Sequence, residues 1–446
     1  LSAFATACIL VAFVVAASAF AWKRNLVSIV WVANGAAVLT AVALLIATRD
    51  LVPFLCALLC MALIAEVAAS RSHWLNWRPV VAVAGDVAIC ILMYVYSRPE
   101  NVRIEYKNVE PALLLTLGSA LFAIYGASIA FRTIRLHQRI AVFETGQTAI
   151  AFLLAAFSAY SFSSRLGTLG AVCFLLAAFC YTAAFVCFDR LSEPRNYHVY
   201  ATWGVALVLA GGFLCLRPLT LTLGLNVAAI AATFLGVRSA RLTLEFHGLL
   251  YVAAAAFVSG LLDYAGRALA GSFPAAPGWT VWTVAASAVV CYSIGGRSQG
   301  ERFQGEQWNH RFLRVLSAAL AVSAAVTFLV SALVWLVAAG MTLGESHVAI
   351  IRTLITCAVA LALAYSGSRW RRIELIWIAY GVLALVTVKL LFEDLYQGHA
   401  GSVAVSISLY AVALIAVPRM ARMGRRRTNP YLRLRQGTTP ACNLDH

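Results

Sequence analysis

The sequence predicts an all-α integral membrane protein, a polytopic bundle of about 15 (14 to 15) transmembrane helices with short loops and no soluble domain. Three observations predict this fold class. Of the 446 residues, 62% are hydrophobic and only 12% are charged, whereas roughly 25% of the residues of a soluble domain are charged. Apolar runs long enough to cross a bilayer recur from one end of the chain to the other. Basic residues cluster in the short segments between these runs.

The expected spans are apolar runs that can cross about 30 Å of hydrocarbon as helices. The first run begins near Leu1 and is expected to be a membrane span. It is not interpreted as a cleaved signal peptide, because it is not followed by a small-residue cleavage pattern and a soluble domain. The two runs around Arg217 and Pro218 are the least clearly separated. The predicted ranges are 1–22, 26–48, 51–70, 79–97, 111–131, 147–164, 167–188, 198–216, 219–237, 247–269, 277–296, 312–340, 346–367, 373–393 and 400–418.

Basic residues also predict the sidedness of the chain, because cytoplasmic loops of membrane proteins are enriched in Lys and Arg. With fifteen spans and a cytoplasmic C-terminus, the inner loops and tail hold 25 of the 34 basic residues and the outer loops hold seven. The predicted topology therefore has the N-terminus outside and the C-terminus in the cytoplasm. The net charge of +16 is explained by this topology, so no nucleic-acid partner is expected.

The spans are expected to be continuous helices, because the prolines lie near their ends and broken helices have little support. Glycines inside the spans are expected to allow close helix contact, namely Gly35, Gly85, Gly118, Gly126, Gly204, Gly211 and Gly212. An Arg-x-x-Arg pattern recurs at inner helix ends and is interpreted as interfacial anchoring. Its pairs are Arg132 and Arg135, Arg238 and Arg241, Arg311 and Arg314, Arg369 and Arg372, and Arg419 and Arg422.

Motifs of soluble catalysis are absent from the sequence. There is no phosphate-binding loop, no His-Glu-x-x-His and no paired Cys-x-x-Cys. The histidines map to predicted loops, helix ends or the tail, which argues against haem held between helices. Ten of the eleven cysteines fall inside predicted helices and are interpreted as small apolar side chains. No cofactor, metal site or catalytic residue is predicted.

Ionisable residues inside the spans are the candidates for function, since each costs about 2.5 to 3.5 kcal/mol at a helix centre. Glu66 and Asp86 lie toward the inner ends of neighbouring spans and could carry protons. The alternative is that each carboxylate snorkels or bonds a Ser or Thr of a neighbouring helix. The outer-side candidates for transport or ion pairing are Asp263, Arg267, Arg352, Lys389, Glu393 and Asp394.

The last outer candidates form a sequence cluster with two open interpretations. Lys389 and Glu393 are four residues apart and can pair across one helical turn, with Asp394 just beyond. The functional interpretation is the mouth of a site for an anionic headgroup or for proton exchange. The structural alternative is a salt-bridge network that joins the last three helices.

The final segment, 419–446, is expected to be a basic cytoplasmic tail that follows a membrane domain of residues 1–418. Its Arg425, Arg426 and Arg427 are expected to bind the anionic inner leaflet, each contributing on the order of 1 kcal/mol. Docking of a protein partner is the alternative role of this tail.

The C-terminal region contains Lys389-Leu-Leu-Phe-Glu-Asp-Leu, then Ser406-Ile-Ser-Leu-Tyr-Ala-Val-Ala-Leu-Ile-Ala and a basic end. In these residues it resembles the C-terminal region of very large bacterial membrane proteins of unknown function. In those proteins a Lys, a Leu or aromatic pair and an Asp close the penultimate helix. The resemblance covers about the last 60 residues and implies a bacterial inner-membrane location without an assigned activity. It singles out Lys389 and Asp394.

Three functional hypotheses follow. The first is a transporter or flippase-like protein for an anionic or lipid-linked small molecule, which the buried charges favour. The second is a non-catalytic membrane scaffold or a subunit of a larger complex, with protein partner subunits. The third is a lipid-linked glycosyl or acyl transferase, for which the candidate residues are Glu345, His347, Asp394 and His399. An enzyme is the least favoured of the three, because the outer loops are short.

Overall fold

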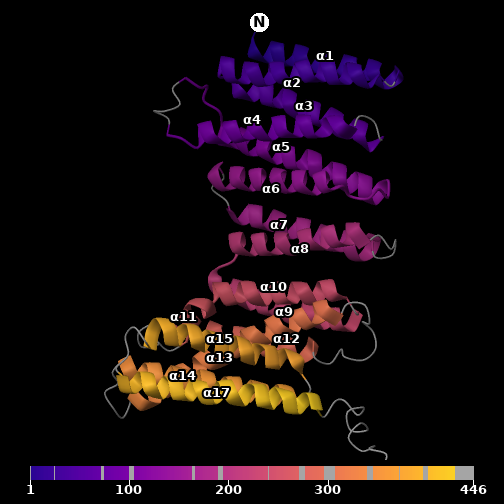
Figure 1. Ribbon diagram of the computed structural model, residues 1–446. Helices are drawn as coiled ribbons and strands as arrows, with labels where there is room; N and C mark the ends of the chain where they lie inside the picture. Colours follow the sequence, from indigo (N-terminus) through magenta and orange to yellow (C-terminus); the bar gives the residue numbers. More distant parts are fainter. Residues whose placement is uncertain are drawn as a thin grey trace, which may run out of the picture. The chain divides into compact units, whose positions relative to one another are not determined.

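A computed structural model describes residues 2–24, 26–71, 75–99, 105–162, 166–188, 194–239, 241–270, 277–295, 307–338, 345–370, 372–394 and 400–426. The regular structure of these residues is helical, with no strand among them. The chain divides into two compact units, Leu1–Cys215 and Leu216–His446. Figure 1 shows the helices coloured by sequence.

Unit 1 is a series of helices that pack mainly on the next one or two helices in the chain. Its core is formed by fully buried aliphatic and aromatic side chains, among them Phe54, Leu58, Ile89 and Leu121. The helices are α1 (Ala3–Arg24), α2 (Val27–Thr48), α3 (Leu51–Ser70), α4 (Arg78–Tyr96), α5 (Pro111–Ala130), α6 (Val142–Phe162), α7 (Leu166–Thr182) and α8 (Pro194–Cys215). Short π-helical turns extend α5 through Phe131–Arg135 and α7 through Ala183–Phe188.

The helices of unit 2 are α9 (Pro218–Ser239), α10 (Leu242–Val258), α11 (Leu261–Ala270), α12 (Trp279–Gly295), α13 (Gln307–Ala338), α14 (Glu345–Arg369), α15 (Ile373–Lys389) and α17 (Ala400–Arg426). The unit is organised around the long helix α13. Helices α10, α11, α12, α14 and α15 all pack against it. A π-helical turn, Leu390–Asp394, follows α15.

The predicted polytopic helical bundle is confirmed. Thirteen helices among the described residues are long and apolar enough to cross a membrane, and the α10–α11 pair makes a fourteenth. Helix α12 has 17 residues and occupies the eleventh range predicted from the sequence. The two runs around Arg217 are separate helices, α8 and α9. The last helix exceeds its predicted end, because it continues through Pro418 to Arg426.

One span contradicts the expectation of continuous helices. The tenth predicted span consists of α10 and α11, which meet at an angle of 64°. Ser259 is the C-cap of α10, and Gly260 follows with φ of +77°. Glycine adopts this left-handed conformation without the steric cost that a Cβ brings. The prediction was wrong because it looked for proline, whereas a single glycine breaks this helix.

Three helix hairpins at predicted inner ends share one backbone geometry. In each, an amide hydrogen bonds the carbonyl five residues earlier, from Leu26 to Ala21, from Arg241 to Gly236 and from Arg372 to Gly367. The first residue of each pair is Ala or Gly, and Lys or Arg stands two positions later. At Gly236 and Gly367 a small residue is needed because the incoming helix crosses directly over it. At Gly236 an added Cβ would lie 2.8 Å from the amide nitrogen of Glu245.

Gly236→Ala is therefore expected to destabilise the α9–α10 hairpin by about 1 to 3 kcal/mol, the usual cost of overpacking. The measurement is the midpoint temperature of thermal unfolding of the purified chain in detergent. Gly224→Ala on the same helix is the matched control, because an added Cβ there meets no atom within 4 Å. Alanine is the better helix former, so this control should be neutral or stabilising. Equal midpoints for both variants would contradict the predicted crossing.

Six of the seven glycines predicted to permit close helix contact divide into two groups. An added Cβ would lie 2.9 Å from the Ser158 Cβ at Gly118, 3.1 Å from the Tyr181 ring at Gly204, and 2.9 Å from the Gly170 carbonyl at Gly211. The prediction is confirmed at these three. At Gly35, Gly85 and Gly126 the nearest atoms lie at 3.5 to 3.8 Å, an ordinary contact distance, so close approach does not explain those glycines.

Candidate functional site

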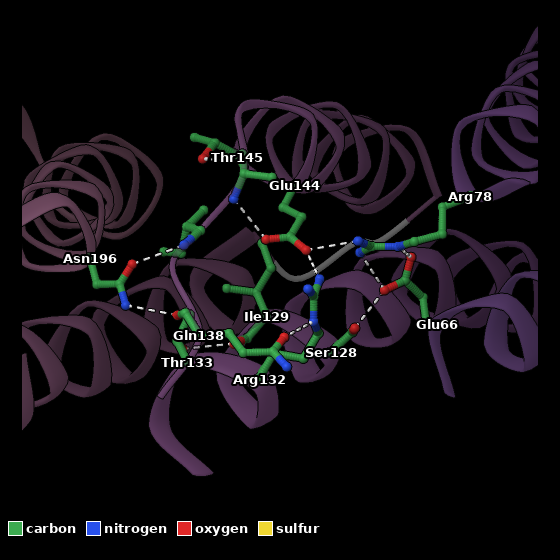
Figure 2. A network of polar contacts seen from close by, with 12 residues as sticks. Glu66, Arg78, Ser128, Ile129, Arg132, Thr133, Gln138, Glu144, Thr145 and Asn196 are labelled. Atoms are coloured by element: carbon green, nitrogen blue, oxygen red, sulfur yellow. Dashed lines mark hydrogen bonds and ion pairs between the residues drawn. The ribbon is translucent and has the colours of Figure 1, made fainter. Parts of the chain in front are cut away.

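The most developed polar site is a buried ion-pair network at one end of unit 1 (Figure 2). Arg78 binds Glu66 through two hydrogen bonds, with Nε 2.9 Å from Oε1 and Nη2 2.7 Å from Oε2. The Ser128 hydroxyl donates to the same Oε2 at 2.5 Å. Glu66 is 3% exposed and Arg78 is 5% exposed. This is the bidentate geometry that the planar guanidinium favours.

Glu144 connects this pair to a second arginine. Its Oε1 accepts a hydrogen bond from Nη1 of Arg78 at 2.8 Å and forms an ion pair with Arg132. Its Oε2 accepts the backbone amide of Ala141 at 2.9 Å. All four oxygens of the two carboxylates therefore have partners, and two negative charges meet two positive ones. The network is electrically neutral as a whole.

Helix ends explain why these residues lie together. Arg78 is the first residue of α4, and Glu66 lies near the end of α3. Each charge opposes the dipole of its own helix, since cations are favoured at C-terminal ends and anions at N-terminal ends. Pairing the two across the hairpin offsets this cost. Glu144, in the first turn of α6, has the favourable sign and caps the helix through the Ala141 amide.

The network continues into the segment between α5 and α6. Nε of Arg132 donates to Oε1 of Gln138 at 2.8 Å. The Asn196 side chain of α8 holds the same segment by accepting the Ile140 amide and donating to the Gln138 carbonyl, each at 3.0 Å. His137 within this segment has φ of +52°. The side chains thus connect the ends of α3, α4, α5, α6 and α8.

A smaller polar contact lies next to this network. The Gln147 amide of α6 donates to both carboxylate oxygens of Asp86 in α4, at 2.8 and 3.0 Å. Asp86 is half-buried and Gln147 is buried. Glu66 and Asp86 thus each have a specific partner on a neighbouring helix. The predicted alternative of a bond to a neighbouring Ser is realised for Glu66 through Ser128.

Unit 2 has a buried ion pair of its own. It lies at helix ends that were also predicted to face the cytoplasm. Arg314 of α13 pairs with Glu374 in the first turn of α15, and both side chains are buried. The Tyr292 hydroxyl of α12 donates to the same Glu374 oxygen at 3.4 Å. The guanidinium of Arg372 lies 5.1 Å from the centre of the Tyr292 ring. Three helices are joined here by one carboxylate and one aromatic ring.

The predicted outer-side residues divide into exposed, buried and undescribed ones. Asp263 and Arg267 form an exposed pair one turn apart on α11. Arg352 is buried and its Nε donates to the Ala268 carbonyl near the end of α11, at 2.8 Å. Lys389 donates to the Ala349 carbonyl at 3.0 Å and to the Thr353 hydroxyl at 2.9 Å. Outside the described residues lie the side chains of Glu393, Asp394, Glu345, Arg425 and Arg426, together with Arg427 and His399.

Two expectations about basic residues are wrong. Arg132 and Arg314 were interpreted as interfacial anchors, yet both are buried in ion pairs. Their partners Glu144 and Glu374, together with Arg78, were not recognised as site residues. The available signal was a glutamate in the first turn of α6 and α15, directly after basic inner segments. His247, expected near a helix end, lies buried within α10.

Two pockets in the described part of the chain are apolar grooves between helices. One, of about 490 Å³, lies between α1 and α3, and the other, of about 450 Å³, lies between α14 and α17. Within the described ranges, no three His, Cys, Asp or Glu side chains are grouped so that they could hold a metal ion. Comparison of the sequence and fold with protein families, curated proteins and solved structures gave no match.

Proposed function

We propose that this multi-pass membrane protein is a non-catalytic scaffold or a subunit of a larger membrane complex. The observation that carries the proposal is the neutral network of Glu66, Arg78, Glu144 and Arg132. It uses the buried charges of unit 1 to hold helix ends in fixed positions. Breaking such a pair leaves an uncompensated charge in a low-dielectric interior, which is strongly unfavourable. An arrangement of this kind suits a rigid element rather than one that releases and rebinds ions.

Exposed apolar faces support the same proposal. In the most apolar 18-residue stretch of α1, only 17% of the residues are buried within the chain, and the same is true of α17. Large exposed side chains on α17 include Ile407, Val412 and Ile415. Membrane helices associate through close packing and not through a hydrophobic driving force. These faces are therefore open to lipid and to the helices of partner subunits.

The proposed location is a bacterial inner membrane, with the N-terminus outside and the C-terminus in the cytoplasm. The positions of the Lys and Arg residues in the loops support this orientation, and the C-terminal resemblance supports the bacterial assignment. We further propose that Arg425, Arg426 and Arg427 bind anionic lipids of the inner leaflet. A tag at His446 should be protected from protease in intact spheroplasts and cleaved after lysis. Cleavage in intact spheroplasts would contradict the orientation.

The scaffold proposal is tested by purification in a mild detergent after chemical cross-linking in the native membrane. The expected result is a stoichiometric complex whose cross-links map to α1 or α17. The control is Trp31→Ala on α2, which removes an exposed ring packed edge-on against Trp77. Because it leaves the faces of α1 and α17 intact, it should not change the complex. A chain that purifies alone and confers a specific solute flux on proteoliposomes would overturn the proposal.

Transport of an anionic or lipid-linked small molecule is the second candidate, and the broken span favours it. Discontinuous helices build the substrate sites of many transporters. Here the bend at Gly260 is accompanied by the buried Arg352, which bonds a carbonyl of α11, and by Lys389 on the neighbouring α15. Arg352 belongs to α14, and Lys389 bonds two residues of the same helix, Ala349 and Thr353.

This candidate is tested by measuring flux in proteoliposomes. Arg352→Ala and Lys389→Ala should abolish any flux that the intact chain confers, whereas Arg98→Ala, at an exposed position of unit 1, should not change it. Asp263→Asn should reduce the flux if the exposed Asp263–Arg267 pair forms part of the entrance. Unchanged flux in all three variants at normal protein level would rule out this site.

A further inference from the structure

The groove between α1 and α3 combines an apolar lining with one unusual hydroxyl. Its lining residues are Val15, Ser18, Ala19, Trp22, Leu63, Ile64 and Val67, which enclose about 490 Å³. The Ser18 side chain is 5% exposed, and its hydroxyl has no hydrogen-bond partner among the described residues. A buried hydroxyl that stays unpaired is costly, so buried polar groups normally have a partner. The hydroxyl therefore indicates a hydrogen-bonding ligand in the groove.

The groove between α14 and α17 provides a direct contrast. It has a similar volume, about 450 Å³, and is also lined by aliphatic side chains and one serine, Ser408. The hydroxyl of Ser408 already donates to the Ala404 carbonyl, at 2.8 Å. This is the usual arrangement for serine in a helix, which bonds the carbonyl four residues earlier. An unsatisfied hydroxyl distinguishes the α1–α3 groove.

Charge at one end of the α1–α3 groove indicates the class of ligand. Trp22 and Val67 mark the end at which both helices terminate. Arg71 is exposed directly after α3, and Lys23 and Arg24 directly follow Trp22 in the sequence. Tryptophan is typical of headgroup depth, and basic residues near the surface attract anionic lipids. An apolar groove, a hydroxyl that can donate to an ester carbonyl and a basic end match the acyl chain, the glycerol ester and the phosphate of an anionic phospholipid.

We propose that the α1–α3 groove binds one anionic glycerophospholipid. The acyl chain lies along the aliphatic lining, the Ser18 hydroxyl donates to an ester carbonyl of the glycerol, and the phosphate group lies toward the basic end. This site is independent of the buried ion-pair network and of the role proposed for the chain.

The test is native mass spectrometry of the full chain, delipidated in detergent and then titrated with phosphatidylglycerol or phosphatidylcholine. One phosphatidylglycerol should be retained in preference to phosphatidylcholine. Ala19→Trp, which fills the groove, should remove this retention, whereas Ala358→Trp in the α14–α17 groove should leave it unchanged. Ser18→Ala removes the hydroxyl with little change in side-chain volume and should weaken binding by roughly threefold to tenfold, the value of one hydrogen bond.

Folding of each variant is checked by its elution as a single species and by its unfolding midpoint without lipid. Equal retention of phosphatidylglycerol by the intact chain and a folded Ala19→Trp variant would overturn the proposal. Equal affinity for the two lipids would overturn its anionic specificity. A lipid-free dimer that Ala19→Trp converts to a monomer would assign the groove to a second copy of the chain and would also overturn it.

Discussion

Arg78→Ala is expected to lower the free energy of unfolding by about 3 to 5 kcal/mol, the usual cost of removing one partner of a buried ion pair. The substitution deletes three side-chain hydrogen bonds, two to Glu66 and one to Glu144. Both carboxylates then remain buried with less compensating charge. The measurement is the midpoint of thermal or denaturant unfolding of the purified chain in detergent, together with its yield from the membrane.

Two further variants separate loss of charge from loss of geometry. Arg78→Lys retains the charge but not the bidentate geometry of the guanidinium, so its free energy of unfolding should lie between those of the native chain and Arg78→Ala. The double variant Arg78→Ala with Glu66→Gln should recover part of the loss, because it removes one of the unpaired charges. Arg267→Ala is the exposed control and should change stability by less than about 1 kcal/mol. A fully stable Arg78→Ala variant would show that the network does not hold unit 1 together.

Gly211→Leu is expected to separate α7 from α8. The two helices cross at Gly170 and Gly211 with reciprocal contacts. A Cβ at Gly211 would lie 2.9 Å from the Gly170 carbonyl, and a Cβ at Gly170 would lie 3.0 Å from the Gly211 carbonyl. Backbone atoms cannot move aside as a flexible side chain does. The cost should therefore exceed the 1 to 3 kcal/mol typical of overpacking and reduce the amount of folded protein in the membrane.

The matched control is Gly224→Leu on α9, where the glycine is exposed and an added Cβ meets no atom within 4 Å. This variant adds the same side chain to an apolar surface and should fold normally. A cysteine pair introduced at Leu176 and Leu207, on the two crossing helices, would report their separation by cross-linking. Unchanged cross-linking in Gly211→Leu would show that the crossing accommodates the larger residue.

The spans could be predicted from the sequence because they depend on local composition, whereas the predicted sidedness stays a prediction. A run of apolar residues predicts a helix without knowledge of its neighbours, and basic residues beside it indicate its orientation. The bend at Gly260 was missed for a related reason. Glycine inside an apolar run is usually a packing residue, and the sequence alone does not distinguish it from a residue with positive φ.

The ion-pair network could not be predicted because its partners are far apart in the chain. Arg78 and Glu144 are 66 positions apart, and Ser128 and Glu66 are 62 positions apart. Their pairing depends on which helices pack together, which composition does not specify. Glu144 was also assigned to a loop, where a charge is normally solvated, although it lies in the first turn of α6. The residue types were visible in the sequence, but their burial was not.

The short separation of Glu66 and Arg78, 12 positions along the chain, has a consequence for biogenesis. A nascent helix that carries an isolated carboxylate enters the bilayer against an insertion penalty of about 2.5 to 3.5 kcal/mol. Since the matching guanidinium leaves the ribosome within the next dozen residues, the two can neutralise each other while α3 and α4 are still beside the translocon. Glu144 and Arg132, synthesised later, then join a hairpin that has already entered the lipid.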